Sequence, residues 1–319
     1  ARMLLSHTSS LRDDAGYNFP AEVSMQSFLV PGGAHYGDGK QWAGQAESAK
    51  AGDFAPGHFF HYVNLNWGVL GSVMEAVTGQ RFDVLMQELV LRPLHITGAY
   101  HPESLSAHDV ADLAVLYRKQ KNEVWDVHGP WVAQTDDLHA QVPEPRAALA
   151  HYVPGTNATL FSPQGGLRIS VRGLSHIMLM LMNQGESDGV RFLQASTVQT
   201  MLSQQWRYDP LRLNGDDYRG LFQSWGLGVQ RFMDVSAAHY GDRLLPPSVQ
   251  TTSNGFSAIG HLGFAYGLES GFFFDPRSKN GMIYVIGGVG ADPETHLGNY
   301  SSLSIWEEEI LSALYQHLQ

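Results

Sequence analysis

The sequence predicts an α+β fold, and three observations carry that prediction. Apolar residues recur at helical spacings through much of the first two-thirds of the chain. Short β-branched and aromatic runs replace them after about residue 220, and the chain ends in an amphipathic segment. Helices, then strands, then a closing helix are typical of an antiparallel sheet flanked by helices, joined to a mostly helical subdomain.

The longest helical periodicity lies between residues 64 and 90, where apolar side chains return every three or four positions. Gly79 fits the end of a first helix there, and Phe82 to Val90 predicts a second. Further helices are expected at 105–120, 174–183 and 196–204. Residues 12–57 and 121–160 are punctuated by Gly, Pro and Asp and predict long loops.

The strand signal is concentrated near the C-terminus. Residues 225–229, 272–274 and 282–286 are short apolar runs rich in aromatic and β-branched side chains. The segment 275–281 between the last two reads Asp-Pro-Arg-Ser-Lys-Asn-Gly, which predicts a hairpin connection. Residues 303–318 predict the amphipathic closing helix.

Composition limits the classes of function. With 319 residues, 43% of them apolar, the chain can bury a large core. We expect a helical, loop-rich part over 1–220 and a strand-rich part over 221–319, packed as one intimate domain. A net charge of −11 without a basic run argues against nucleic acid. The absence of cysteine excludes disulfides and thiolate metal sites, and no apolar stretch reaches the roughly 20 residues of a membrane span.

Generic catalytic motifs do not account for the chain. It contains no His-Glu-x-x-His, no phosphate-binding loop and no Gly-x-Ser-x-Gly. His58 and His61 stand three apart among fifteen histidines, but no carboxylate accompanies them at ligand spacing. Polar loop histidines are the better interpretation, so we expect neither a metal nor a cofactor. A histidine-based metal hydrolase is a distant alternative.

Four segments, taken together and in this order, point to one family. They are Leu-Leu-Ser-His-Thr-Ser-Ser-Leu at 4–11, Pro-Gly-His-Phe-Phe-His-Tyr-Val-Asn at 56–64, Ser-Pro-Gln-Gly-Gly-Leu at 162–167 and Gly-His-Leu-Gly-Phe at 260–264. Ser10 stands where the first motif usually has glycine. The set resembles the class C β-lactamase-like serine hydrolases, a family that includes penicillin-binding proteins, D-amino-acid peptidases and esterases. The resemblance implies the serine β-lactamase and transpeptidase fold.

The resemblance also implies roles for individual residues. Tyr62 matches the tyrosine that shares the base role with a lysine, and Asn64 matches the amide that orients the substrate and that lysine. His261 takes the cationic position of the last motif, which makes it a second catalytic candidate. Leu262 and Gly263 fall on substrate-binding positions, and a backbone N–H at Gly263 could help to form an oxyanion hole. A phenol becomes a useful base only where cationic neighbours favour phenolate.

Each of these residues also has a plain structural interpretation. Tyr62, next to two phenylalanines, could be a packed tyrosine with a satisfied hydroxyl. Asn64 precedes a predicted helix and could be its N-cap, alone or in addition to a functional role. His261 could be an ordinary loop histidine, and Gly165-Gly166 a place where two backbones approach closely.

The family's nucleophile motif, Ser-x-x-Lys, is not found. None of the lysines has a serine three positions before it; they are Lys40, Lys50, Lys119, Lys121 and Lys279. In the family this motif lies upstream of the turn that matches residues 4–11, so the nucleophile is unknown and we expect its helix, with the first strands of the sheet, to be missing from this chain. A separate N-terminal segment or a second copy would then complete the molecule, or these residues are part of a longer chain.

Two further departures bear on the substrate. Val63 replaces a serine that relays protons, and Leu262 replaces a threonine that contacts the carboxylate of β-lactams. With His261 in place of lysine, the site offers little fixed charge to an anion. We expect an acyl-enzyme hydrolase for esters, small amides or D-amino peptides rather than penicillins. We then expect Tyr62 and His261 to face each other across one cleft. The alternative is a non-catalytic module that binds peptide or glycan in that cleft. Family habit favours a bacterial envelope location.

Overall fold

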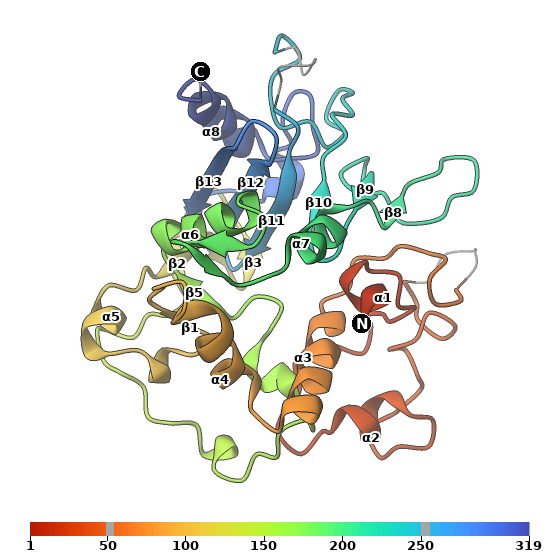
Figure 1. The fold of residues 1–319 in the computed structure, drawn as a ribbon, viewed down its shortest axis with the longest axis vertical. Helices are drawn as coiled ribbons and strands as arrows, with labels where there is room; N and C mark the ends of the chain where they lie inside the picture. The colour runs from red at the N-terminus through yellow and green to blue at the C-terminus, as the bar shows by residue number, and fades with distance from the viewer. Residues whose placement is uncertain (49–53, 250–255, 319) are drawn as a thin grey trace. The chain divides into compact units, whose positions relative to one another are not determined.

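The computed structural model describes residues 1–48, 54–249 and 256–318 (Figure 1). Its contacts divide the chain into two compact units. The first contains residues 1–111, 140–170 and 209–216, and the second contains residues 112–139, 171–208 and 217–319. Each unit therefore draws on segments that are far apart in the sequence. The boundary near residue 220 stays a prediction.

The first unit is built from short helices and loops. Its helices are α1 (Arg2–Leu5), α2 (Met25–Leu29), α3 (Leu65–Thr78), α4 (Phe82–Met86) with a π-helical continuation η1 (Gln87–Leu91), and α5 (Ala107–Ala111). Shorter pieces are η2 (Pro102–Ser104), η3 (Ala147–Leu149), η4 (Ala158–Phe161) and the strand pair β1 (Gly98–Ala99) and β5 (Arg168–Ile169). Gly79 ends α3 in the left-handed conformation, with φ 71°, as predicted.

The buried side chain of Glu75 connects α3 to α4 and to the segment around residues 152–155. It lies on α3 and is fully buried. Its carboxylate accepts hydrogen bonds from Phe82 N at 2.8 Å, Gly155 N at 2.9 Å and the Tyr152 hydroxyl at 2.5 Å. One side chain therefore satisfies the first turn of α4 and anchors the segment that leads to η4. A buried charge is tolerated where such donors replace its lost hydration.

The second unit contains a six-stranded antiparallel sheet. Its order is β13 (Asn280–Ile286), β12 (Leu268–Asp275), β11 (Ile259–Ala265), β10 (Gln230–Arg231), β9 (Ser224–Trp225) and β8 (Trp206–Arg207). Asp275 pairs with Asn280 across the turn, which confirms the predicted hairpin. The remaining strands of this unit are β2 (Leu116–Lys121), β3 (Val124–Trp125), β4 (Trp131–Thr135), β6 (Glu186–Ser187), β7 (Val190–Arg191) and β14 (Gly288–Val289).

Helices α6 (Val171–Met182) and α8 (Ile305–Tyr315) pack on opposite faces of this sheet (Figure 1). Met282 on β13 belongs to a hydrophobic cluster with Leu311 of α8. A side chain on the preceding residue, Gly281, would collide with Met178 of α6. Since successive residues of a strand face opposite sides, the two helices cover different faces. The unit also contains α7 (Ala195–Leu202) and the turn η5 (Pro293–Thr295), and α8 confirms the predicted closing helix.

Two local predictions were wrong. Only five residues of the expected helix at 105–120 are helical, as α5, and Leu116–Lys121 forms strand β2 instead. Residues 121–160, expected as loop, supply β3 and β4 as well as short helical turns. Strand β2 is held by pairing with β4 and, in parallel, with β14 about 170 residues later. Such distant pairing overrides weak local propensity. Within the described residues no helix is long and apolar enough to cross a bilayer.

A buried pair of glutamates lies between the sheet and α8. Glu269 on β12 accepts a hydrogen bond from Ser304 Oγ at 3.0 Å, and Glu307 on α8 accepts one from the Tyr284 hydroxyl at 2.6 Å. Both carboxyls are buried. Burial, with the neighbouring Glu307 charge, raises the pKa of Glu269 to about 8, and burial also raises the pKa of Glu307. Glu269 is therefore protonated in the folded protein at neutral pH.

This raised pKa makes stability depend on pH. In the folded state Glu269 keeps its proton up to about pH 8, whereas in the unfolded chain it loses that proton above the ordinary pKa of a glutamate. The stability that the protonated side chain contributes is therefore fully present below the ordinary pKa and is lost as pH rises toward 8. We expect the free energy of urea unfolding to fall between pH 5 and pH 8.5, and Glu269→Gln to flatten that fall. Glu309→Gln, an exposed change on α8, is the control. An equally steep fall in Glu269→Gln would contradict the assignment.

Candidate active site

The turn at residues 4–11 is held in a strained conformation. His7 and Ser10 both have positive φ, at 54° and 67°, which costs a non-glycine residue about 1–2 kcal/mol. The value at Ser10 explains why glycine is usual at that position of the motif. Backbone bonds attach the turn to the Tyr62 segment, with His61 N donating to His7 O at 2.9 Å. The first two motifs therefore form one local structure.

His7 is the buried centre of this structure. Its ring is 1% exposed and stacks on the Tyr62 ring, with 4.4 Å between centroids and 25° between planes. The Val63 N–H reaches His7 Nδ1 at 3.0 Å, and the Asn66 amide nitrogen stands 3.2 Å from the same atom. Because Val63 N can only donate, Nδ1 is an acceptor and carries no proton. Sequence analysis assigned His7 no role, although it lies inside the first motif.

Tyr62, the other ring of this stack, is half-buried. Burial, and then the negative charge of Asp13, raises the pKa of Tyr62 to about 12. Neither influence favours phenolate, so the hydroxyl is protonated at neutral pH in the described structure. The base role of Tyr62 therefore stays a prediction, and it requires a positive charge brought close to the phenol.

Asn64 occupies the N-cap position of α3, but within the described residues its side chain makes no capping bond. Asp13 does so instead: Asn64 N donates to Asp13 Oδ2 at 2.8 Å, and Leu65 N to Oδ1 at 2.9 Å. The Asn64 side-chain amide adds a bond to Oδ2 at 3.2 Å. The predicted N-cap position of Asn64 is therefore confirmed, although its side chain does not make the capping bond. The cap comes from a residue 51 positions earlier, which local sequence does not reveal.

A histidine–carboxylate pair adjoins Tyr62 in the chain. His61 Nδ1 lies 2.5 Å from Asp216 Oδ2, and the two side chains are 14% and 8% exposed. Phe60 N donates to Asn214 O at 3.0 Å, and Asp216 N donates to Phe60 O at 2.9 Å. These bonds fasten residues 209–216 to the segment that carries Tyr62. In the described parts of the chain no three His, Asp or Glu side chains are grouped as metal ligands.

His261 lies on β11, opposite Phe272, in the second unit. Its ring meets the edge of Trp225, with centroids 5.5 Å apart and planes at 83°. Nδ1 stands 2.5 Å from Leu262 O, so Nδ1 donates its proton to that carbonyl. Burial lowers the pKa of His261 and disfavours the imidazolium. The structure therefore gives the expected cationic position a neutral imidazole.

Leu262 and Gly263, which follow His261 on β11, lie on opposite faces of the sheet. Leu262 pairs with Gly271 and packs against the hydrophobic cluster beneath α8, which gives it a packing role. Gly263 lies on the other face, as His261 does, because side chains alternate along a strand. A Cβ at Gly263 would come too close to Ser270 Oγ, so a larger residue there would require the Ser270 side chain to move. Contact of Leu262 and Gly263 with a substrate stays a prediction.

The predicted residues thus form two local groups. Tyr62 and Asn64 lie together in the first unit, and His261, Leu262 and Gly263 lie together on β11 in the second. The prediction that Tyr62 and His261 line one cleft remains a prediction.

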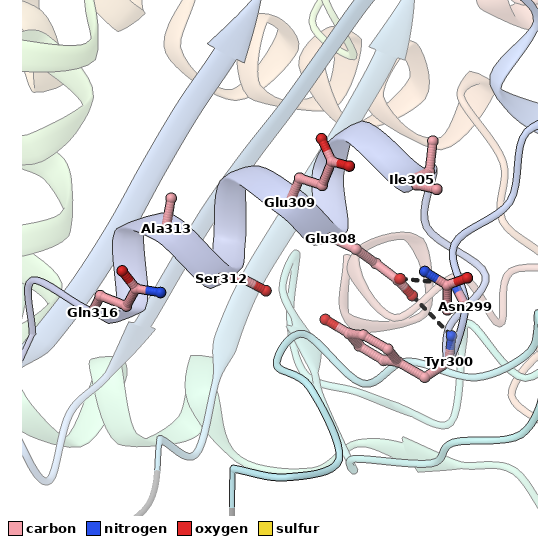
Figure 2. A pocket seen from close by; sticks show the side chains of 8 residues that line it. All are labelled: Asn299, Tyr300, Ile305, Glu308, Glu309, Ser312, Ala313 and Gln316. Carbon is pink, nitrogen blue, oxygen red and sulfur yellow. Dashed lines mark hydrogen bonds between the residues drawn. The ribbon is translucent and has the colours of Figure 1, made fainter.

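A hollow of about 310 Å³ lies along one face of α8 and has no part in these groups (Figure 2). Its lining consists of Asn299, Tyr300, Ile305, Glu308, Glu309, Ser312, Ala313 and Gln316. At one end Glu308 accepts hydrogen bonds from Asn299 N at 2.7 Å and Tyr300 N at 3.1 Å, as the dashed lines show. This carboxylate holds the preceding loop against the helix, which is a structural task.

Nearly the whole chain matches one protein family. The family model described as Beta-lactamase matches residues 1–304. This chain belongs to the β-lactamase family. The prediction made from the four motifs is confirmed, and with it the α+β fold class. The family is one of serine hydrolases, which include carboxypeptidases and amidases.

Relatives of this β-lactamase-family protein are distant. A protein of Escherichia coli strain K12 named "Putative D-alanyl-D-alanine carboxypeptidase" is 24% identical over 180 residues, which are 56% of this chain and 39% of that protein. The chain thus spans about two-fifths of the length of that relative.

Solved structures agree on the fold. The D-amino acid amidase from Ochrobactrum anthropi SV3, complexed with L-phenylalanine amide, has a TM-score of 0.56 at 16% identity, covering 100% of this chain and 73% of the amidase. The octameric penicillin-binding protein homologue from Pyrococcus abyssi has a TM-score of 0.54 at 17% identity, covering 92% of this chain and 52% of the homologue.

Proposed function

We propose that this chain belongs to a serine hydrolase that works through an acyl-enzyme on esters, small amides or D-amino peptides. One observation carries the proposal. The segment that matches the family's tyrosine motif is fixed at three points, by the His7 stack on Tyr62, by the Asp13 bonds to Asn64 and by the His61–Asp216 pair. A site that must hold a reacting group in place needs such support.

The proposed chemistry divides acyl transfer into two steps. A serine hydroxyl attacks the substrate carbonyl carbon, and the Tyr62 oxygen takes the serine proton. The C–O or C–N bond then breaks, and the leaving group receives that proton. Water attacks the acyl-serine in the same way and releases the acid. Because the pKa of Tyr62 is raised to about 12, the scheme needs a cation beside the phenol, as a lysine of a Ser-x-x-Lys segment would supply.

The surroundings of His261 favour uncharged or D-amino substrates over penicillins. Burial lowers the pKa of this histidine, so it offers no fixed positive charge to a carboxylate. Leu262 has no hydroxyl to donate. A site without a partner for a carboxylate discriminates against substrates that carry one. The name of one structural neighbour, a D-amino acid amidase, supports D-amino substrates that carry an amide in place of a carboxylate.

The test compares substrates with the natural polypeptide that contains this sequence. We expect p-nitrophenyl butyrate or D-phenylalanine amide to be cleaved with kcat/KM about tenfold or more above that for nitrocefin. A fluorophosphonate probe should label the protein in parallel, because it traps a reactive serine. Rapid nitrocefin turnover without ester or amide cleavage would overturn the substrate proposal.

A second candidate is a non-catalytic module that binds peptide or glycan. The observation in its favour is the protonated Tyr62 phenol, which can donate a hydrogen bond but cannot act as a base. Calorimetric titration with a peptidoglycan fragment distinguishes the two. Binding without fluorophosphonate labelling would favour the module, whereas labelling would exclude it.

A further inference from the structure

Asp13 is bonded to the segment that carries Tyr62 and Asn64. It follows the strained turn and is half-buried. Its two carboxylate oxygens accept bonds from the backbone N–H groups of Asn64 and Leu65, at 2.8 and 2.9 Å. The first turn of α3 is therefore capped by a side chain outside that helix, and the position of Asn64 depends on it.

The third bond of Asp13 concerns the Asn64 side chain. Asn64 Nδ2 stands 3.2 Å from Asp13 Oδ2. An ionised carboxylate only accepts hydrogen bonds, so the NH₂ group of the amide must face it and the carbonyl oxygen must point away. The carboxylate therefore determines which end of the amide a ligand would meet. An amide turned round would present a donor where the native one presents an acceptor.

The same carboxylate acts on Tyr62. After burial, the charge of Asp13 is the influence that raises the pKa of the phenol. Burial raises the pKa of Asp13 itself, but the N–H bonds from Leu65 and Asn64 and the charge of His61 work against that rise. His61 in turn bonds Asp216. Asp13 and Asp216 thus both bond to the one segment that carries Tyr62, Asp13 at Asn64 and Asp216 at His61.

We propose that Asp13 is a positioning residue, whose carboxylate orients the Asn64 amide and, through its bonds to Asn64 and Leu65, holds a negative charge on the segment that carries Tyr62. The proposal rests on the proposed function for the importance of Asn64 and Tyr62. If Asp13 acts in this way, Tyr62 keeps its proton as long as no cation lies near the phenol. The phenol becomes a base only when a cation offsets Asp13, which ties activity to a completed site.

The decisive variant is Asp13→Asn, and the matched control is Asp14→Asn. Asp14 is the next carboxylate along the chain, is exposed, and bonds Ser48 instead. The Tyr62 titration is followed by NMR of protein with ¹³C-labelled tyrosine, with Tyr62→Phe identifying the signal. We expect Asp13→Asn to give about threefold more phenolate at the same alkaline pH, because a nearby negative charge is gone. Asp14→Asn should leave the titration unchanged.

A merely structural role for Asp13 would not move that titration. A folded Asp13→Asn variant, judged by circular dichroism, with an unchanged Tyr62 midpoint would overturn the proposal. Should this variant not fold, Asp13→Glu takes its place: it keeps the charge and moves the oxygens, so the Asn64 side-chain amide resonances should shift. Unshifted resonances would also overturn it. Neither readout requires turnover, so a protein without hydrolase activity would refute the proposed function and leave this test intact.

Discussion

A Tyr62→Phe variant of the natural polypeptide is expected to lose about 10²- to 10⁴-fold in kcat, which is the usual contribution of a positioned acid–base group. The change removes one hydroxyl and keeps the ring that stacks on His7 at 4.4 Å. The fold should therefore survive, and KM should change little, because in the proposed mechanism the phenol transfers a proton and does not hold the substrate. Initial rates on the best ester or amide substrate measure the effect.

The control for this variant is Tyr240→Phe, which removes a hydroxyl from a half-exposed tyrosine of the second unit. It should leave kcat within twofold of the parent value. If Tyr62→Phe keeps its kcat and instead raises KM, Tyr62 contributes to binding only. The non-catalytic module would then be the better account of the first unit, and the base would have to be sought elsewhere.

The sequence could predict those site residues that lie within short family motifs. Tyr62 and Asn64 stand in one segment whose spacing is typical of the family, and the match over residues 1–304 confirms the family. Local signals also sufficed for some of the fold. Gly79 ends α3 with φ 71°, which glycine adopts without strain. The hairpin at 275–281 follows from its Pro, Asn and Gly content, and pairing of Asp275 with Asn280 confirms it.

What sequence could not predict depends on partners far away in the chain. Asp13 caps a helix 51 residues later, and His61 pairs with a carboxylate 155 residues later. Strand β2 carries no clear strand pattern and owes its conformation to β4 and β14. For Asp13 and His61, the residue type alone predicts a solvated polar group. Only the folded chain shows that the group is withdrawn from solvent and bonded.

Buried carboxylates also show how much the fold depends on polar contacts that hydrophobic patterning ignores. Glu75 lies within a helix that periodicity predicted correctly, yet it faces inward with no exposed surface. Burial raises its pKa, while bonds from Tyr152, Gly155 and Phe82 act in the opposite direction. A carboxylate with three donors can remain ionised inside a protein. Without them it would be among the most costly residues to bury.

Replacing Glu75 with alanine is therefore expected to lower the free energy of unfolding by about 3–5 kcal/mol, since two N–H groups and a hydroxyl would lose their acceptor and a cavity would remain. Glu75→Gln keeps the shape and one acceptor, and should cost about 1–2 kcal/mol. Glu88→Ala, at an exposed position of the same unit, should stay within about 0.5 kcal/mol of the parent. Urea unfolding followed by near-ultraviolet circular dichroism measures all three. Equal stabilities for Glu75→Ala and Glu88→Ala would mean that water replaces the lost acceptor, and the carboxylate would then have no structural role in joining α3 to α4.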